Sequence, residues 1–95
     1  MEERSVYIEK LEAKLRELEA EIDKLKAKGE GKSADAKIEF EQAMGRLEAK
    51  RDEMRIKLED LNKSTSSAWE ELKVGTEQAW NDLKNAVANA YEKYK

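Results

Sequence analysis

Residues 67–95 read SAWEELKVGTEQAWNDLKNAVANAYEKYK, in which a unit of eleven residues occurs twice in full and once in part. The unit places Trp69, Trp80 and Tyr91 eleven residues apart. Eleven residues complete three turns at about 3.67 residues per turn, close to the 3.6 of an α-helix, so these side chains stay on one side of a helix. The repeat therefore predicts an α-helix over about residues 67–94.

The apolar side of this helix is broad. Its stripe consists of Trp69, Leu72, Thr76, Trp80, Leu83, Val87, Tyr91 and Tyr94, and small residues widen it at Ala68, Gly75, Ala79, Ala86 and Ala90. Such a face is wider than the seam between two helices requires. We therefore expect two neighbouring helices or one very wide neighbour, with the small residues, Gly75 included, allowing close packing.

Residues 2–28 carry a strict heptad pattern with apolar residues spaced alternately by three and four: Ile8, Leu11, Leu15, Leu18, Ile22 and Leu25. This pattern predicts a helix. It fits either a zipper between two copies of the chain or a helix of an intramolecular bundle. Because it covers only about three heptads, we favour the bundle helix.

Residues 34–62 carry a similar apolar stripe, formed by Phe40, Met44, Leu47, Met54, Leu58 and Leu61. Arg51 occupies the core position between Leu47 and Met54, which makes it a candidate register or packing residue. We expect its aliphatic stem to pack and its guanidinium to turn outward. A symmetrical hairpin places Arg51 level with Leu11 and Glu12, so its guanidinium would reach Glu12 or another acid, or stack on Trp80.

The connections are polar and contain helix-end signals. Gly29 and Gly31 are expected to stop the first helix through their backbone freedom, and Ser33 can cap the second. Residues 62–66 read NKSTS, a polar turn. Ser67 followed by Glu70 fits a capping box at the start of the last helix.

Composition agrees with long helices, because 43% of the residues are charged and the chain has no proline. We predict an all-α fold in one domain, residues 1–95: an antiparallel three-helix bundle or coiled coil with up-down-up topology and helices at about 2–28, 34–62 and 67–94. In the alternative architecture the first two helices open into an arm that pairs with another chain. Monomer and homodimer both remain open.

The residue types exclude most catalytic chemistry. Without histidine or cysteine, the chain has no nucleophilic triad and no zinc or di-iron ligand set of the usual kind. Asp35, Glu39 and Glu41 do not form a calcium loop, since Arg46 stands where the bidentate glutamate belongs. We expect no catalytic, cofactor-binding or metal-binding residue, no small-molecule substrate, and a protein that is not an enzyme.

Charge and hydropathy limit the kinds of partner and the location that we expect for this protein. The net charge of −3 is spread evenly along the chain, which argues against nucleic acid. No stretch approaches the roughly 20 apolar residues of a membrane span, and the N-terminal sequence MEERSVYIEK is unlike a secretory signal, so we expect a cytoplasmic protein.

The remaining candidate for a functional surface is the apolar face of the last helix. It consists of Trp69, Leu72, Trp80, Leu83, Val87, Tyr91 and Tyr94. We expect this face to associate with a protein helix, either of the same chain or of another partner. The alternative function is peripheral binding to a lipid or membrane surface. It is disfavoured because residues 67–95 carry five acids and four bases, which gives no cationic polar side.

The runs YIEKLEAKLRELEAEIDKLKAK, SADAKIEFEQ and AWEELKVGTEQAWNDLKNAV resemble a family of small bacterial coiled-coil proteins described as stress-responsive. The most specific part is the doubled motif at residues 68–73 and 79–84, an Ala-Trp pair followed by two polar residues and Leu-Lys. The resemblance implies a helical cytoplasmic protein linked to stress, with no active site to assign.

Overall fold

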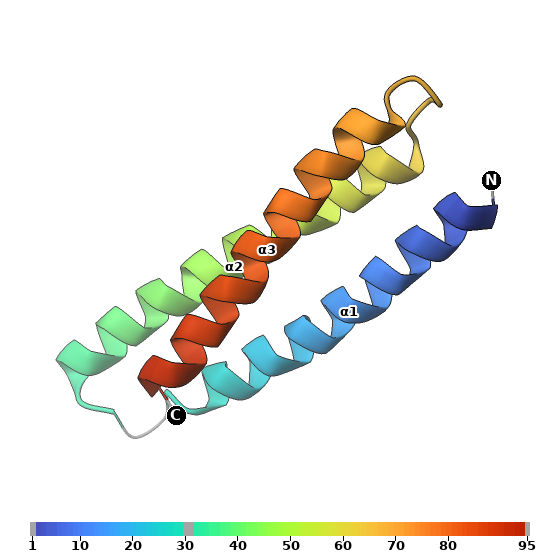
Figure 1. The fold of residues 1–95 in the computed structure, drawn as a ribbon. Helices are drawn as coiled ribbons and strands as arrows, with labels where there is room; N and C mark the ends of the chain where they lie inside the picture. The colour runs from blue at the N-terminus through green and yellow to red at the C-terminus, as the bar shows by residue number, and fades with distance from the viewer. Residues whose placement is uncertain (1, 30–31, 95) are drawn as a thin grey trace.

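The computed structural model describes residues 2–29 and 32–94 of the chain. It contains three α-helices, α1 (Glu2–Ala27), α2 (Ala34–Asn62) and α3 (Trp69–Tyr94), and the described residues include no β-strand. Consecutive helices run in opposite directions and form an elongated bundle of 51 × 18 × 18 Å (Figure 1). The predicted all-α three-helix bundle with up-down-up topology is confirmed.

The core forms where the apolar stripes of the helices meet. All six heptad residues of α1 and all six apolar stripe residues of α2 are buried, and α3 adds Thr76, Leu83 and Val87. Burying one large aliphatic side chain contributes roughly 1.5–3 kcal/mol. The stripes read from the sequence are therefore the surfaces that hold the helices together.

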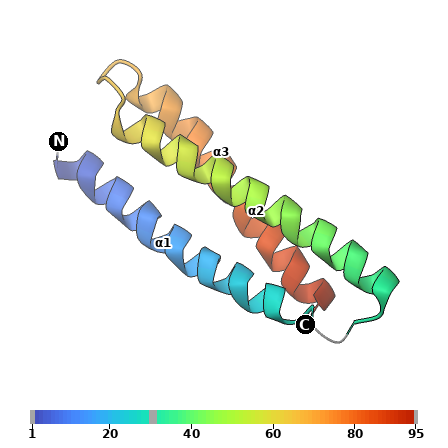
Figure 2. The same ribbon diagram turned by 180° about the vertical axis from the view of Figure 1, so that it is seen from behind.

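The three helices do not pack equally. α2 and α3 pack most extensively, while α1 makes its smallest contact with α3 (Figures 1 and 2). Partly buried Tyr7, Trp80, Tyr91 and Tyr94 lie at the edges of the core. The side of the bundle between α1 and α3 is consequently its least filled side.

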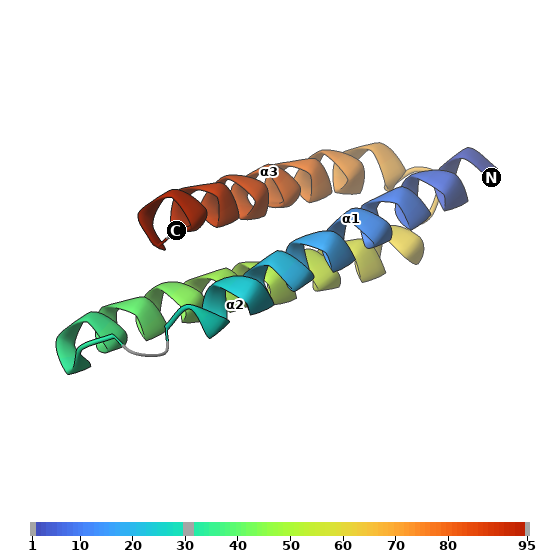
Figure 3. The ribbon, with the colours of Figure 1, turned by 90° about the horizontal axis from the view of Figure 1, so that it is seen from below.

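Helix α1 is displaced along α2 relative to a symmetrical hairpin. Lys26 in the last turn of α1 pairs with Glu48 near the middle of α2, at 3.0 Å, and Glu19 pairs with Arg55. The first turns of α2 extend beyond the end of α1 (Figure 3). The expectation that Arg51 lies level with Leu11 and Glu12 is therefore wrong.

A close contact accounts for this displacement. Gly29, just after α1, is buried against the ring of Phe40 in α2. Gly29 thus lies beside the second turn of α2 and not beside the first residue of that helix. In a symmetrical hairpin the end of α1 would lie beside the start of α2. The contact between Gly29 and Phe40 shows that it does not.

The two polar connections differ in how well they were predicted. Ser33 caps α2 as expected, since its hydroxyl accepts a hydrogen bond from the Ala36 amide at 3.4 Å. The proposed Ser67–Glu70 capping box is wrong. Thr65 takes the capping role, because its hydroxyl accepts from the Ala68 amide at 3.3 Å and its carbonyl accepts from the Trp69 amide at 3.1 Å.

Two of the described glycines, Gly29 and Gly75, have different roles from those expected. Gly29 does not adopt a left-handed backbone, so the reason for glycine there is space: an added Cβ would lie 2.5 Å from Cε1 of Phe40. Gly31 lies outside the described residues. An added Cβ at Gly75 would meet nothing within 4 Å, so the expectation that Gly75 permits close helix packing is wrong. Gly45 is equally open.

We predict opposite effects for alanine at two of these glycines. Gly45→Ala should raise the free energy of unfolding by about 0.5–1 kcal/mol, because alanine favours a helix interior and its methyl group meets no atom. Gly29→Ala should lower it by about 1–3 kcal/mol through overpacking against Phe40. Urea denaturation followed by circular dichroism measures both values. Equal effects at the two sites would contradict the assigned contact.

Candidate interaction face

The structure divides the predicted face of α3 into a buried centre and a partly exposed remainder. Leu83 and Val87 are 0% and 2% exposed and belong to the core. The other predicted residues are partly buried: Trp69, Leu72, Trp80, Tyr91 and Tyr94. This second group offers most of the apolar surface that a partner could contact.

Trp69 is already engaged by the start of α1. The ring of Tyr7 meets it edge-on with centroids 5.8 Å apart, and the guanidinium of Arg4 lies 4.3 Å from the Trp69 ring centroid. Arg4 also donates hydrogen bonds to the carbonyl and hydroxyl oxygens of Ser64, at 2.9 and 2.7 Å. Trp69, the first residue of α3, therefore holds the start of α1 against α3. Arg4 also joins α1 to the second connection.

Tyr94 has a comparable role at the opposite end. Its ring meets that of Phe40 edge-on at 4.9 Å, and the Lys32 ammonium lies 5.5 Å from its centroid. Such aromatic pairs stabilise by about 0.5–1.5 kcal/mol beyond the area that they bury. Both ends of the predicted face are thus used to close the bundle.

An open groove lies between these two ends, along α1 and α3. It has a volume of about 490 Å³, and its apolar lining comes from Leu18, Trp80, Val87 and Tyr91. Its other lining residues are Lys14, Glu17, Glu21, Lys84 and Ala88. We call this site the α1–α3 groove. It is the part of the predicted face that remains accessible.

Sequence reasoning did not assign the contribution of α1 to this groove. Leu18 was identified only as a core residue, and Lys14, Glu17 and Glu21 were not singled out. These charged residues look like an ordinary solvated helix face in the sequence, because alternating acids and bases are typical of exposed helix surfaces. Their position beside Trp80 depends on how α1 lies against α3.

Tyr7 is a second residue that sequence reasoning missed. Its hydroxyl donates a hydrogen bond to Oε1 of Glu77, at 2.9 Å, and so links α1 to α3. Burial, and then the hydrogen bond to Glu77 and the charge of that carboxylate, raise the pKa of the Tyr7 phenol from 10.0 to about 12. The neutral phenol is therefore the form that the folded protein favours.

This shift predicts a pH dependence of stability. Between about pH 10 and pH 12 the unfolded chain releases the Tyr7 proton while the folded protein retains it. The contribution of Tyr7 to the free energy of unfolding is therefore complete below pH 10 and is lost as the pH rises through this window. Urea midpoints measured from pH 9 to 12 should fall more for the wild type than for Tyr7→Phe. Parallel curves would show that the hydrogen bond to Glu77 is absent in solution.

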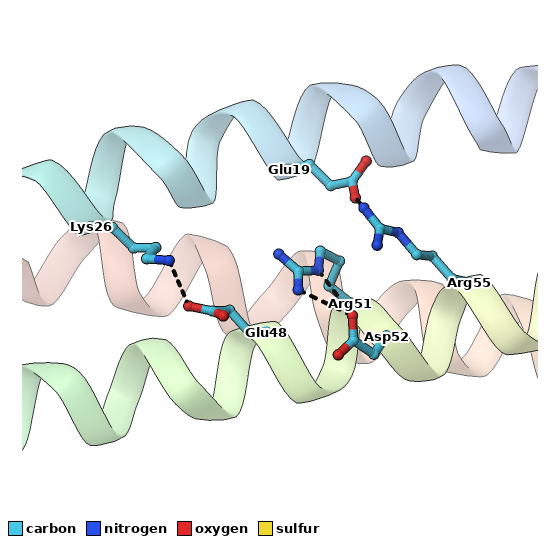
Figure 4. A network of polar contacts seen from close by, with 6 residues as sticks. All are labelled: Glu19, Lys26, Glu48, Arg51, Asp52 and Arg55. Atoms are coloured by element: carbon cyan, nitrogen blue, oxygen red, sulfur yellow. Dashed lines mark hydrogen bonds and ion pairs between the residues drawn. The ribbon is translucent and has the colours of Figure 1, made fainter.

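Arg51 lies on α2 between the two ion pairs that join α2 to α1 (Figure 4). Its side chain is 21% exposed, and its guanidinium donates to Oδ1 of Asp52 at 3.1 and 3.2 Å. The expected acidic partner is present, but it is a neighbour on the same helix. Glu12 does not serve as the partner, because α1 is displaced along α2. The Arg51 guanidinium is turned to Asp52 and does not stack on Trp80.

Substitutions at Arg51 should separate packing from charge. Arg51→Leu should be neutral or stabilising, since an exposed ion pair contributes only about 0–1 kcal/mol and leucine continues the apolar stripe. Arg51→Asp should lower the melting temperature, because it places a second carboxylate beside Asp52 on a half-buried position. Thermal unfolding by circular dichroism tests both variants. An unchanged melting temperature for Arg51→Asp would place this side chain in full solvent.

The structure also bears on other kinds of site. Within residues 2–29 and 32–94, no group of three acidic side chains lies close enough together to hold a metal ion. None of the helices in that part of the chain combines the length and apolarity needed to cross a membrane. The site that can be described is therefore an apolar groove with a charged rim.

The fold and this groove define a class of protein, the all-α three-helix bundles with a partly exposed aromatic face. No family model, curated protein or solved structure matches the chain. The resemblance to small stress-responsive coiled-coil proteins accordingly stays a prediction from the sequence.

Proposed function

We propose that this protein is a non-enzymatic interaction module that binds an amphipathic helix of a protein partner in the α1–α3 groove. The observation that supports the proposal is the aromatic pair Trp80 and Tyr91, partly exposed along a groove of about 490 Å³. Tryptophan and tyrosine are enriched among the residues that dominate binding energy in protein interfaces. Their rings offer a large apolar area together with a polar group.

The shape of the site favours a helix as the ligand. α1 and α3 run in the same direction (Figure 1), and the groove between them is lined by residues 14–21 of α1 and 80–91 of α3. A fourth helix laid there would meet Leu18 from one side and Trp80 and Tyr91 from the other. Four-helix bundles bury apolar stripes of this kind in the same way.

The rim indicates what the partner helix carries. Lys14 and Lys84 provide positive charge, while Glu17 and Glu21 provide negative charge. A partner with a single sign of charge would be attracted by one pair and repelled by the other. We therefore propose a partner helix with an apolar stripe and charges of both signs, which includes a second copy of this chain.

The lipid-binding alternative has less support. Leu83 and Val87, central to the α3 stripe, are 0% and 2% exposed, so α3 would have to leave the bundle before this stripe met a lipid surface. Residues 67–95 also lack the cationic side that strengthens binding to anionic lipid. The link to stress rests on the family resemblance, and a rise in transcript level under osmotic or oxidative stress would support it.

Site-specific cross-linking tests the groove directly. A photo-reactive phenylalanine analogue in place of Ala88 lies on the groove, and irradiation should give a defined cross-linked species, a dimer or a complex with one partner. The matched variant Trp80→Ala should remove most of this product, since loss of a central aromatic residue typically costs at least about 2 kcal/mol of binding. Asn81→Ala, exposed on α3, should leave it unchanged. Equal yields from all three proteins would contradict the proposal.

Tryptophan fluorescence separates this function from lipid binding. In a Trp69→Phe background Trp80 is the single reporter. Its emission should shift to shorter wavelength with the protein partner or at a concentration where the chain self-associates. It should not change with vesicles of phosphatidylcholine containing phosphatidylglycerol. A blue shift caused by these vesicles alone would favour the lipid-binding alternative.

A further inference from the structure

The outer face of α2, opposite the core, carries two large apolar side chains that nothing covers. Ile38 and Ile56 are 57% and 58% exposed. Gly45 and Ala49, between them in the sequence, are exposed as well. At about 100° per residue, these four residues project within about 40° of one another, so they form one strip along the helix. We call it the α2 outer strip.

This strip has the profile of a helix-docking surface. The small residues Gly45 and Ala49 lie in its middle, and an added Cβ at Gly45 would meet no atom within 4 Å. The isoleucines lie at its two ends, roughly 27 Å apart at 1.5 Å per residue. A second helix can approach closely at the small residues while its own apolar side chains contact Ile38 and Ile56.

Among the charged residues of α2 itself, those nearest the strip are acidic. Within about 60° of its centre, helix α2 presents only acidic residues among its charged side chains: Asp35, Glu41, Asp52, Glu53, Glu59 and Asp60. Asp52 pairs with Arg51, and Glu59 pairs with Lys63 just beyond the helix. In the described part of the chain, Asp35, Glu41, Glu53 and Asp60 form no ion pair. The chain as a whole has 22 acids and 19 bases, so this imbalance is local.

We propose that the α2 outer strip binds a basic amphipathic helix, one with an apolar ridge flanked on both sides by lysine or arginine. The ridge would cover Ile38 and Ile56, and the flanking cations would pair with Glu41, Glu53 and Asp60. Complementary charge of this kind selects partners and accelerates association. This surface lies on a different face from the α1–α3 groove, so the inference stands independently of the proposed function.

The same charges exclude two other occupants. A second copy docked antiparallel about a two-fold axis, with Gly45 against Ala49, would bring Glu41 of one copy beside Asp52 of the other, and like charges so placed repel. An anionic membrane would be repelled by the acidic flanks. A single helix contact also buries less than the roughly 1,200 Å² of a stable interface, so we expect weak, salt-dependent binding.

Fluorescence anisotropy with two synthetic helical peptides tests the proposal. Both peptides have about 21 residues and the same leucine ridge, and they differ only in carrying lysine or glutamate on the flanks. The full chain should bind the lysine peptide at least tenfold more tightly than the glutamate peptide. This preference should shrink as sodium chloride is raised. Equal affinity for the two peptides, or no binding of either, would overturn the proposal.

Two substitutions at one position locate the binding surface. Gly45→Lys introduces a bulky cation into the strip and should weaken binding of the lysine peptide at least tenfold. Gly45→Ala, the matched control, should change the affinity less than threefold. Both side chains have open space, so circular dichroism should show folded proteins. If Gly45→Lys binds like the wild type while Trp80→Ala does not, the peptide occupies the α1–α3 groove and the α2 outer strip is not its site.

Discussion

The structure depends on the burial of one apolar stripe on α2 between the two other helices. Met54 and Leu61 of this stripe are fully buried, and Phe40, Met44, Leu47 and Leu58 are nearly so. α2 is the central helix of the chain, and both α1 and α3 pack against it in an antiparallel orientation. The hydrophobic effect thus makes α2 the common support on which α1 and α3 are placed.

Aromatic contacts at the two ends of the bundle partly bury both ends of the apolar face of α3. Arg4 and Tyr7 engage Trp69 at one end, and Phe40 engages Tyr94 at the other. Of the three helix pairs, α1 and α3 make the smallest contact, and Trp80 lies at the edge of the groove between them. The accessible aromatic site therefore lies between the two ends that these contacts close.

The two proposed surfaces differ in the partner that they select. The α1–α3 groove combines aromatic side chains with a rim of both charges, which favours a helix of mixed charge. The α2 outer strip combines exposed Ile38 and Ile56 with acidic flanks, which favours a basic helix. Since these surfaces lie on different sides of the bundle, one protein could hold two helices together, as a scaffold does.

The positions of the three helices and their buried sides follow from the amino-acid sequence. Each apolar stripe depends only on residue spacing along one helix, and a spacing of three or four residues has the same meaning wherever that helix is placed. Thus the heptad of α1 and the stripe of α2 were predicted correctly, and Leu83 and Val87, which the sequence assigned to the apolar face of α3, are buried in the core. The register of α1, the partner of Arg51 and the rim of the groove became known from the packing of the three helices. These depend on contacts between distant residues, above all Gly29 against Phe40, and no local pattern encodes the path of a connection.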